Sequence, residues 1–369
     1  MVIFGILLTY ELEVIVLFYI DLLNKHWRDL MATLKDIAKE ANVSVTTVSN
    51  VIHGNHKRVA PETIEKIKMI IEKNNYVPNM TARSLVNKLS KIIGVINHVV
   101  PEKSGNFISD PFHSVVIEGI ENKLREKGYY LMIRTVHTEE ELFSLLANWN
   151  MDGLILTGLF QDNFFEKLMN ANVPFVLVDS YIENQKVLNI GLEDCSGGYM
   201  ATKHLIDKGH RSIVFASPII KHNGVVEERF KGYKLALKEA GIPYDSKNVY
   251  QQEITITEGI ELGHKLSKRA DVTAIFATAD ILAAGIISGL NEQGKRVPDD
   301  FSVVGFDDLF ISSLTAPRLT TIHQDVQEKG RIAAEALISV IEGAEIKNNN
   351  ITLPVTLVER HSVRDISGL

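Results

Sequence analysis

The stretch Ala32–Ile52, ATLKDIAKEANVSVTTVSNVI, decides how the first part of the chain folds. Thr33, with Asp36 three residues later, predicts a helix N-cap, because a threonine hydroxyl can accept hydrogen bonds from the free amides of a first turn. The apolar residues that follow recur every three or four positions, which is the spacing of one face of a short helix. These residues are Leu34, Ile37, Ala38 and Ala41.

A tight turn at Asn42-Val43 leads into a second predicted helix, which Ser44 caps. Thr46 and Asn50 lie one turn apart on its outer side, and the apolar residues lie opposite: Val48, Val51 and Ile52. Two short helices, a tight turn and a polar outer face form the helix-turn-helix arrangement, whose second helix enters the DNA major groove. Periodicity alone leaves an ordinary helical hairpin as the alternative.

A third amphipathic helix follows, with Pro61 suited to its first position and isoleucines facing inward at Ile64, Ile67, Ile70 and Ile71. The chain then reads YVPNMTARSLVNKLSKIIGVI from Tyr76 to Ile96. The whole run from Ala32 to Ile96 resembles the lactose-repressor/galactose-repressor family of bacterial transcription regulators. The resemblance extends nearly to the last residue and leaves only the first thirty or so unmatched.

The resemblance implies an N-terminal all-α helix-turn-helix DNA-binding domain at residues 31–78 and a hinge helix with a linker at 79–91. Residues 92–369 would form an α/β, two-lobed, periplasmic-binding-protein-like domain of doubly wound parallel sheets that binds an effector and dimerises. In the family the hinge helix orders only on operator DNA, and two copies insert leucines into the minor groove. Leu85 matches that leucine, and an apolar wedge of this kind unstacks a base step and bends the duplex.

Charge is distributed unevenly along the chain. The net charge is −7 overall, yet residues 31–91 carry ten lysines and arginines against five aspartates and glutamates. A basic head on an acidic body indicates a nucleic-acid contact confined to the head. The single cysteine, Cys195, excludes an internal disulfide framework and suits a reducing cytoplasm.

Residues 1–30 form an apolar extension that fits neither a signal peptide nor a membrane span. No lysine or arginine precedes Lys25, whereas a signal peptide begins with positive charge. A spanning helix would bury Glu11, Glu13 and Asp21, and each buried acid costs about 2.5–3.5 kcal/mol. Met31 stands where family members usually begin, so we expect a mis-called start; a real extension packed on the body and a membrane tether are the alternatives.

From Lys91 onward, apolar strands alternate with helices that end at glycines, as at Gly128, Gly209, Gly241 and Gly294. This pattern predicts parallel sheets covered by helices on both faces, and it is too long for one sheet. The resemblance implies three crossings between two lobes, placed near Asn189, Thr321 and Ile351. The N-lobe would span about 92–189 and 327–342, and the C-lobe about 190–321 and 353–360.

No catalytic constellation is present in the sequence. It contains no G-x-x-x-x-G-K-[ST] loop, no G-x-G-x-x-G fingerprint, no G-x-S-x-G elbow and no H-E-x-x-H pair. We therefore expect that the protein is not an enzyme and that it binds neither a cofactor nor a metal. A solute-binding protein of the same two-lobed fold is the second class considered, but it would lack the basic head and carry an export signal.

Two aspartates close predicted strands, Asp179 after PFVLV and Asp307 in VGFDD, while Arg229 lies in the first turn of a predicted helix. Ligands in doubly wound sheets bind at the carboxyl ends of strands, and an arginine fork can clamp hydroxyls or a carboxylate. Individually, each acid could be a helix cap or a surface residue. The resemblance implies that the effector is held by Asp110, Phe112, Asp179, Arg229, Asp280 and Asp307. Many family members have Asn-Asp where this chain has Ala279-Asp280, so one potential ligand contact is lost.

The sequence thus predicts a ligand-responsive, sequence-specific transcription regulator, a repressor of a carbohydrate-utilisation operon that binds a palindromic operator as a homodimer. Its partners would be double-stranded operator DNA and a sugar or sugar derivative, and no membrane association is expected. It would be located in the cytoplasm, on the nucleoid. The residues expected to contact DNA are Thr33, Ser44, Val45, Thr46, Thr47, Ser49, Asn50, Asn79, Ala82 and Leu85.

Overall fold

The computed structural model describes residues 32–52, 54–74, 76, 89–98, 107–182, 184, 186–345 and 349–368. The chain divides into two compact units, residues 1–90 and residues 91–369. The expectations for the extension at 1–30 and for the hinge residues Asn79, Ala82 and Leu85 lie outside the described residues.

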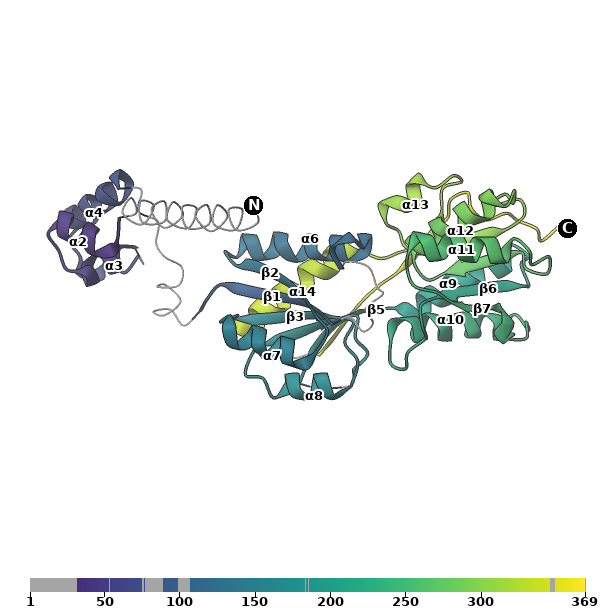
Figure 1. Ribbon diagram of the computed structural model, residues 1–369, viewed down its shortest axis with the longest axis horizontal. Helices are drawn as coiled ribbons and strands as arrows, with labels where there is room; N and C mark the ends of the chain where they lie inside the picture. The colour runs from purple at the N-terminus through teal and green to yellow at the C-terminus, as the bar shows by residue number, and fades with distance from the viewer. Residues whose placement is uncertain are drawn as a thin grey trace, which may run out of the picture. The chain divides into compact units, whose positions relative to one another are not determined.

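The first unit is helical: α2 (Leu34–Ala41), α3 (Val45–Ile52), the short 3-10 turn η1 (His56–Arg58) and α4 (Pro61–Lys73) (Figure 1). The predicted N-cap is confirmed, because Thr33 and Asp36 form a reciprocal capping box. Asn42 ends α2 in the left-handed conformation, with φ of 58°, which is what allows the tight turn into α3.

One small apolar core holds these three helices together. Its buried residues are eight of those predicted to face inward: Ile37, Ala38, Ala41, Val48, Val51, Ile64, Ile67 and Ile70. The other three, Leu34, Ile52 and Ile71, are partly buried and pack against it. Lys66 of α4 donates a hydrogen bond of 2.9 Å to the carbonyl of Ala41 at the end of α2. Lys73 pairs with Glu40 at 2.6 Å, so α4 is fastened to α2 by polar contacts as well as by packing.

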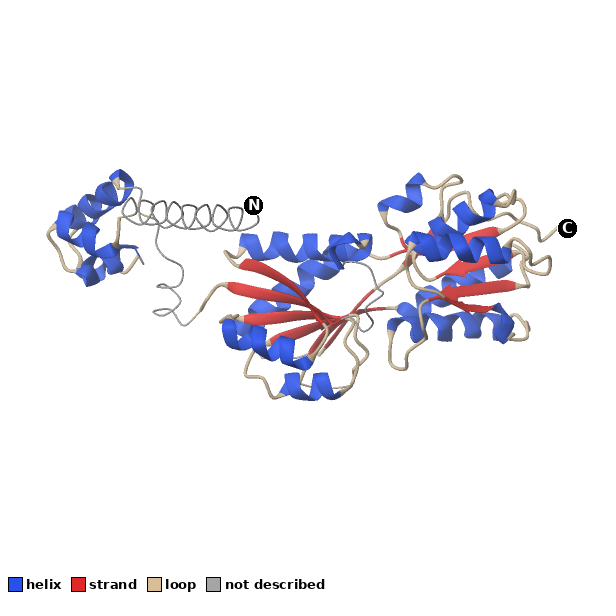
Figure 2. Cartoon of the chain, in the orientation of Figure 1, coloured by secondary structure: helices blue, strands red, loops and turns tan. Residues whose placement is uncertain are grey.

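The second unit contains two six-stranded sheets with helices on their faces (Figure 2). The strand orders are β11-β5-β4-β3-β1-β2 and β12-β10-β9-β8-β6-β7, so both sheets have the same doubly wound order and each gains one late strand. All described pairings are parallel except β10 with β12. The predicted fold of two parallel-rich lobes is confirmed.

The N-lobe contains both the first half of the second unit and a late return of the chain. Its elements are β1 (Ile92–His98), η2 (Phe107–Ser109), α6 (Pro111–Glu126), β2 (Tyr130–Val136), α7 (Glu139–Asn148), β3 (Gly153–Thr157), α8 (Asn163–Met169), β4 (Phe175–Val178), β5 (Leu188–Leu192), α14 (Val326–Ile341) and β11 (Asn350–Leu353).

The C-lobe follows the same alternation of strand and helix. Its elements are α9 (Asp194–Asp207), β6 (Ile213–Ser217), α10 (Val225–Glu239), η3 (Ser246–Asn248), β7 (Val249–Gln251), α11 (Ile256–Leu266), β8 (Ala274–Ala277), α12 (Asp280–Glu292), β9 (Ser302–Asp307), α13 (Phe310–Leu314), β10 (Thr320–His323) and β12 (Thr356–Val358).

The chain passes between the lobes three times, each time a few residues after the predicted position. The first crossing follows β5, which continues to Leu192 because it pairs there with β11. The second lies between His323 and Val326. The third corrects the expectation of one strand from Leu353 to Arg360: Pro354 has no amide hydrogen to donate and separates β11 of one sheet from β12 of the other.

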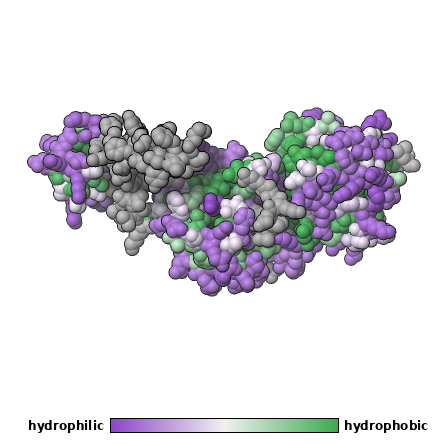
Figure 3. Space-filling model, viewed as in Figure 1, coloured by the Kyte–Doolittle hydropathy of each residue, from purple (hydrophilic) through white to green (hydrophobic). Residues whose placement is uncertain are grey.

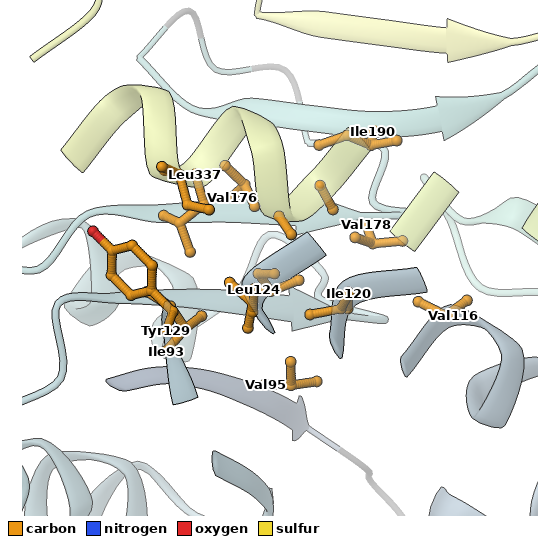
Figure 4. Packing of buried hydrophobic residues seen from close by; sticks show 14 of the residues in the cluster. Ile93, Val95, Val116, Ile120, Leu124, Tyr129, Val176, Val178, Ile190 and Leu337 are labelled. Carbon is orange, nitrogen blue, oxygen red and sulfur yellow. The ribbon is translucent and has the colours of Figure 1, made fainter. Parts of the chain in front are cut away.

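The N-lobe core lies between its sheet and the helices α6 and α14. Figure 4 shows Val116, Ile120 and Leu124 of α6 with Leu337 of α14 packed against residues of the strands, labelled Ile93, Val95, Val176, Val178 and Ile190. The two helices approach so closely that a Cβ on Gly119 would lie 2.0 Å from the carbonyl oxygen of Gln327. A side chain at this position would therefore push α14 away from α6.

The described residues on the face shown in Figure 3 are mostly hydrophilic, with local apolar areas. Phe310 and Leu314 of α13 are the most exposed large apolar side chains among the described residues, and an apolar area is visible at the top of the C-lobe, where Figure 1 places α13. No helix within the described part of the chain is both long enough and apolar enough to span a membrane.

Candidate functional site

The first candidate site is the outer face of α3. Ser44 accepts from the amide of Thr47 at 3.0 Å, which confirms it as the cap of this helix. Val45, at 42% exposure, and Thr46 are exposed, while Asn50 is partly exposed one turn further on. The helix therefore offers a short polar and methyl-bearing face of the kind that reads base edges in the major groove.

The second candidate site is a cavity of about 290 Å³ between the lobes, just below the roughly 300–1,000 Å³ usual for small-molecule sites. Its walls come from segments that follow β3, β4, β6, β8 and β9, that is, from carboxyl ends of strands in both sheets. Its polar lining residues are Asp110, His113, Thr157, Asp179, Lys221, Arg229, Thr278 and Asp307. Much of the remaining lining is apolar, including Phe112, Phe160, Ile219, Ile254, Ile281 and Leu309.

Arg229 lies in the second turn of α10 and is buried, with 7% exposure. Its Nε donates to Asp194 Oδ1 at 2.8 Å, its Nη1 donates to the carbonyl of Thr278 at 2.6 Å, and its guanidinium lies over the ring of Phe306. Asp194 also accepts from the hydroxyl of Tyr181 at 2.6 Å. The guanidinium is thus fixed in place before any ligand arrives, which lowers the entropy lost on binding.

Asp307 faces Arg229 from the end of β9, with 3.9 Å between Oδ1 and Nη1. Gln324 donates to the same carboxylate oxygen at 2.6 Å. Burial raises the pKa of Asp307 to about 7, against the opposing influence of Arg229. Its φ of 106° is unusual for a residue with a side chain, and such strained backbone tends to occur at binding sites.

Asp179 supplies the carboxylate on the N-lobe side of the cavity, and it too has a positive φ, of 55°. Lys329 of α14 lies behind it at 1% exposure and donates to Asp179 Oδ1 at 2.7 Å. The same ammonium donates to Gln324 Oε1 at 2.7 Å. A continuous buried polar chain therefore runs from Asp179 through Lys329 and Gln324 to Asp307, from one lobe to the other.

Asp110 and Phe112, which the resemblance assigns to the effector site, lie at the start of α6. Asp110 is the N-cap of α6, accepts from the amide of Phe112 at 3.2 Å and pairs with His113. The ring of Phe112 lies near the Lys329 ammonium and lines the cavity.

The expectation for Asp280 needs correction, because this residue does not line the cavity. It is fully buried at the start of α12, where it accepts from the amide of Leu309 at 2.8 Å and from the hydroxyl of Thr321 at 2.6 Å. Burial raises the pKa of Asp280 well above its ordinary value. It ties α12 to the segments after β9 and at β10, and so supports the cavity from behind.

Five residues of the site were missed in the sequence: Tyr181, Asp194, Thr278, Gln324 and Lys329. Lys329 carried a signal, since it falls on the apolar face of α14, where the buried neighbours are Val326, Gly330, Ala333 and Leu337. A charged residue on such a face needs a buried partner. Asp194 carried no comparable signal, because an acidic residue at the start of a helix, here the first residue of α9, is usually explained by the helix dipole.

A helix-turn-helix head joined to a two-lobed domain with a preformed cavity defines a ligand-responsive DNA-binding regulator. Comparison with known families agrees with this class. Residues 33–79 match the model for bacterial regulatory proteins of the lacI family, and residues 202–363 match that for a periplasmic binding protein-like domain.

Relatives resemble the chain over nearly its whole length. The HTH-type transcriptional regulator DegA of Bacillus subtilis is 32% identical over 348 residues, which cover 92% of this chain and 100% of DegA. A transcriptional regulator CelR–cellobiose complex matches with a TM-score of 0.67 and 30% identity, over 90% of this chain and 99% of that one. The lac repressor dimer bound to operator and the anti-inducer ONPF matches with a TM-score of 0.79 and 26% identity, over the same shares. The chain belongs to the lacI family of bacterial transcription regulators.

Proposed function

We propose that this protein represses a carbohydrate-utilisation operon by binding a palindromic operator as a homodimer, and that a sugar or sugar derivative changes its affinity for that operator. It would act in the cytoplasm on the nucleoid. The observation that carries this proposal is that Asp179 of the N-lobe and Asp307 of the C-lobe line one cavity together with Arg229, whose guanidinium is held by Asp194. Carboxylates accept hydrogen bonds from hydroxyl groups, and a preorganised arginine fork donates to their oxygens.

On the DNA side, we propose that the outer face of α3 reads bases through Val45, Thr46 and Asn50. Thr33, Ser44, Thr47 and Ser49 would contact the phosphate backbone around it, because hydroxyl groups and helix N-termini commonly bind phosphate oxygens. The resemblance supports a minor-groove role for Asn79, Ala82 and Leu85, with Leu85 as the inserted side chain. The relative solved on its operator as a dimer supports the same oligomeric state here.

The test is an electrophoretic mobility shift with DNA fragments that flank the gene, run with and without D-ribose, D-glucose, D-galactose, maltose and cellobiose. The relative solved with cellobiose motivates the disaccharides. Specific retention of one fragment, altered by one sugar, is the expected result. Thr46→Ala is the matched control, since it should lose specific retention and keep sugar binding. If no fragment is retained specifically, the DNA-binding half of the proposal is contradicted. If a fragment is retained but none of the sugars changes its retention, the carbohydrate half is contradicted.

A further inference from the structure

Thr278 is the first residue after β8 and lies at the wall of the cavity. Ala274 and Phe276 of β8 pack into the core beneath α9 and α10, whereas Ile275 and Ala277 pack into the core beneath α11 and α12. Because side chains alternate along an extended strand, Thr278 continues the first face, toward the helix that carries Arg229. Its backbone is fully used: the amide donates to Ala216 at 2.9 Å and the carbonyl accepts from Arg229.

The side chain of Thr278 is in a different situation. The residue is 1% exposed, and its Oγ1 makes no hydrogen bond to any residue that the structure describes. Other buried threonines of the same lobe are satisfied: Thr202 donates to the carbonyl of Gly198, and Thr321 donates to Asp280. Buried hydroxyl groups without a partner are uncommon and call for a specific explanation.

The surroundings of this hydroxyl are those of a binding site. The bonds of Arg229 to described residues use Nε and Nη1, which leaves Nη2 for another acceptor in the same corner. The next residue, Ala279, has only a methyl group, so no neighbouring side chain on this turn supplies a polar atom in place of Thr278.

The charges around the cavity restrict what can bind. Arg229 is paired with Asp194 and Lys329 with Asp179, and a further cation of the wall, Lys221, lies over the ring of Phe160. Because Arg229 and Lys329 are already paired, a carboxylate or phosphate on a ligand would compete with Asp194 and Asp179 for them and would lie near the carboxyl groups of Asp110 and Asp307. A hydroxyl group, which both donates and accepts, meets no such penalty.

We propose that Thr278 is a specificity-determining residue whose Oγ1 binds an oxygen of an uncharged polyhydroxylated effector, in the corner that it shares with Arg229 Nη2. The inference rests on the proposed function and deepens it, since it assigns a residue and a charge class to the effector. It makes Thr278 a binding residue whose hydroxyl contributes to affinity for the effector and not to folding.

The test compares Thr278→Val with Thr278→Ser in the full-length protein. Valine replaces the hydroxyl with a methyl group of similar size, and serine keeps the hydroxyl and removes the methyl group. The probes are the five uncharged sugars named above together with glucuronate and glucose 6-phosphate, measured by isothermal titration calorimetry, while thermal denaturation without sugar reports stability.

We expect Thr278→Val to denature at the wild-type temperature or above, because no hydrogen bond within the protein is lost. It should bind the responsive sugar about 2- to 10-fold more weakly, which is the usual contribution of one neutral hydrogen bond. Thr278→Ser should bind it within about twofold of wild type, a loss smaller than that of a neutral hydrogen bond. Equal affinity of the valine variant, or its failure to fold, would overturn the Thr278 assignment alone. Preference for an anionic probe would overturn the charge class. If no sugar binds the wild type, the carbohydrate function fails together with this inference.

Discussion

Lys329 Nζ lies 2.7 Å from Asp179 Oδ1, and the two side chains are only 1% and 14% exposed. This buried pair joins α14 to the end of β4 and, through Gln324, reaches Asp307 in the other lobe. Breaking a buried pair leaves one charge without a partner, which typically costs 3–5 kcal/mol, whereas removing both charges costs far less.

Lys329→Met should therefore lower the free energy of unfolding by about 3–5 kcal/mol, and the double variant Asp179→Asn with Lys329→Met should recover most of that loss. Urea denaturation followed by circular dichroism measures both. Lys203→Met is the matched control, because the Lys203–Asp207 pair is largely exposed and its loss should barely move the transition. A Lys329→Met protein as stable as wild type would show that the buried pair does not support the fold.

Arg229 both binds the effector, in our account, and holds Asp194. Arg229→Ala would leave Asp194 buried and unpaired and so would lower stability along with binding. Arg229→Lys keeps a positive charge near Asp194 but has no planar fork, so stability should be better preserved while affinity for the responsive sugar falls about 10- to 100-fold. Titration calorimetry combined with thermal denaturation separates the two effects. Normal sugar affinity in the lysine variant would place the binding site elsewhere.

The pH dependence follows from Asp307, whose pKa burial raises to about 7 from an ordinary 3.8. Between these values the folded protein holds a proton that the unfolded chain has lost, so this group's contribution to stability falls as pH rises from about 4 to 7. A sugar hydroxyl donating to Asp307 favours the ionised form. Sugar affinity should therefore rise as pH increases from 6 to 8, by at most about tenfold per unit below the pKa.

Arg229, Lys329, Asp110 and Asp280 also act on Asp307, and a control must separate their influence. Asp307→Asn has nothing to ionise at this position, so its weaker sugar binding should be flat between pH 6 and 8. Calorimetric titrations of both proteins at several pH values provide the measurement. An unchanged pH profile in the asparagine variant would assign the titration to another group.

The side chain of Asn50 leads to a prediction about the base sequence of the operator. Its amide can bond both N6 and N7 of adenine, whereas arginine pairs with the two acceptors of guanine. We expect A·T at the corresponding position of each half-site, and a shift toward G·C in Asn50→Arg of about 1–3 kcal/mol per bidentate contact. Selection of sites from random DNA, run in parallel for both proteins, checks this. Identical recovered motifs would mean that Asn50 does not read a base.

The residues that could be foreseen are those tied to a repeating pattern. Asp179 and Asp307 follow apolar strands, and parallel strands end at one edge of a sheet, so their convergence on a cavity was predictable. Their partners were not, because Asp194, Gln324 and Lys329 reach the site only once α9 and α14 are packed against the sheets. Asp280 shows the opposite error: it follows β8 closely in sequence, but it begins α12 and its bonds to Leu309 and Thr321 turn it away from the cavity.

The central claim is that sugar binding and operator binding are coupled, and coupling free energies are reciprocal. The most direct measurement is the affinity for the operator fragment, by fluorescence anisotropy at fixed salt, across a concentration series of the responsive sugar. The account predicts a change in operator affinity of about 5- to 150-fold at saturating sugar, matched by the same factor in sugar affinity when operator is present. If the sugar and the operator both bind but neither changes the affinity of the other, the account is contradicted.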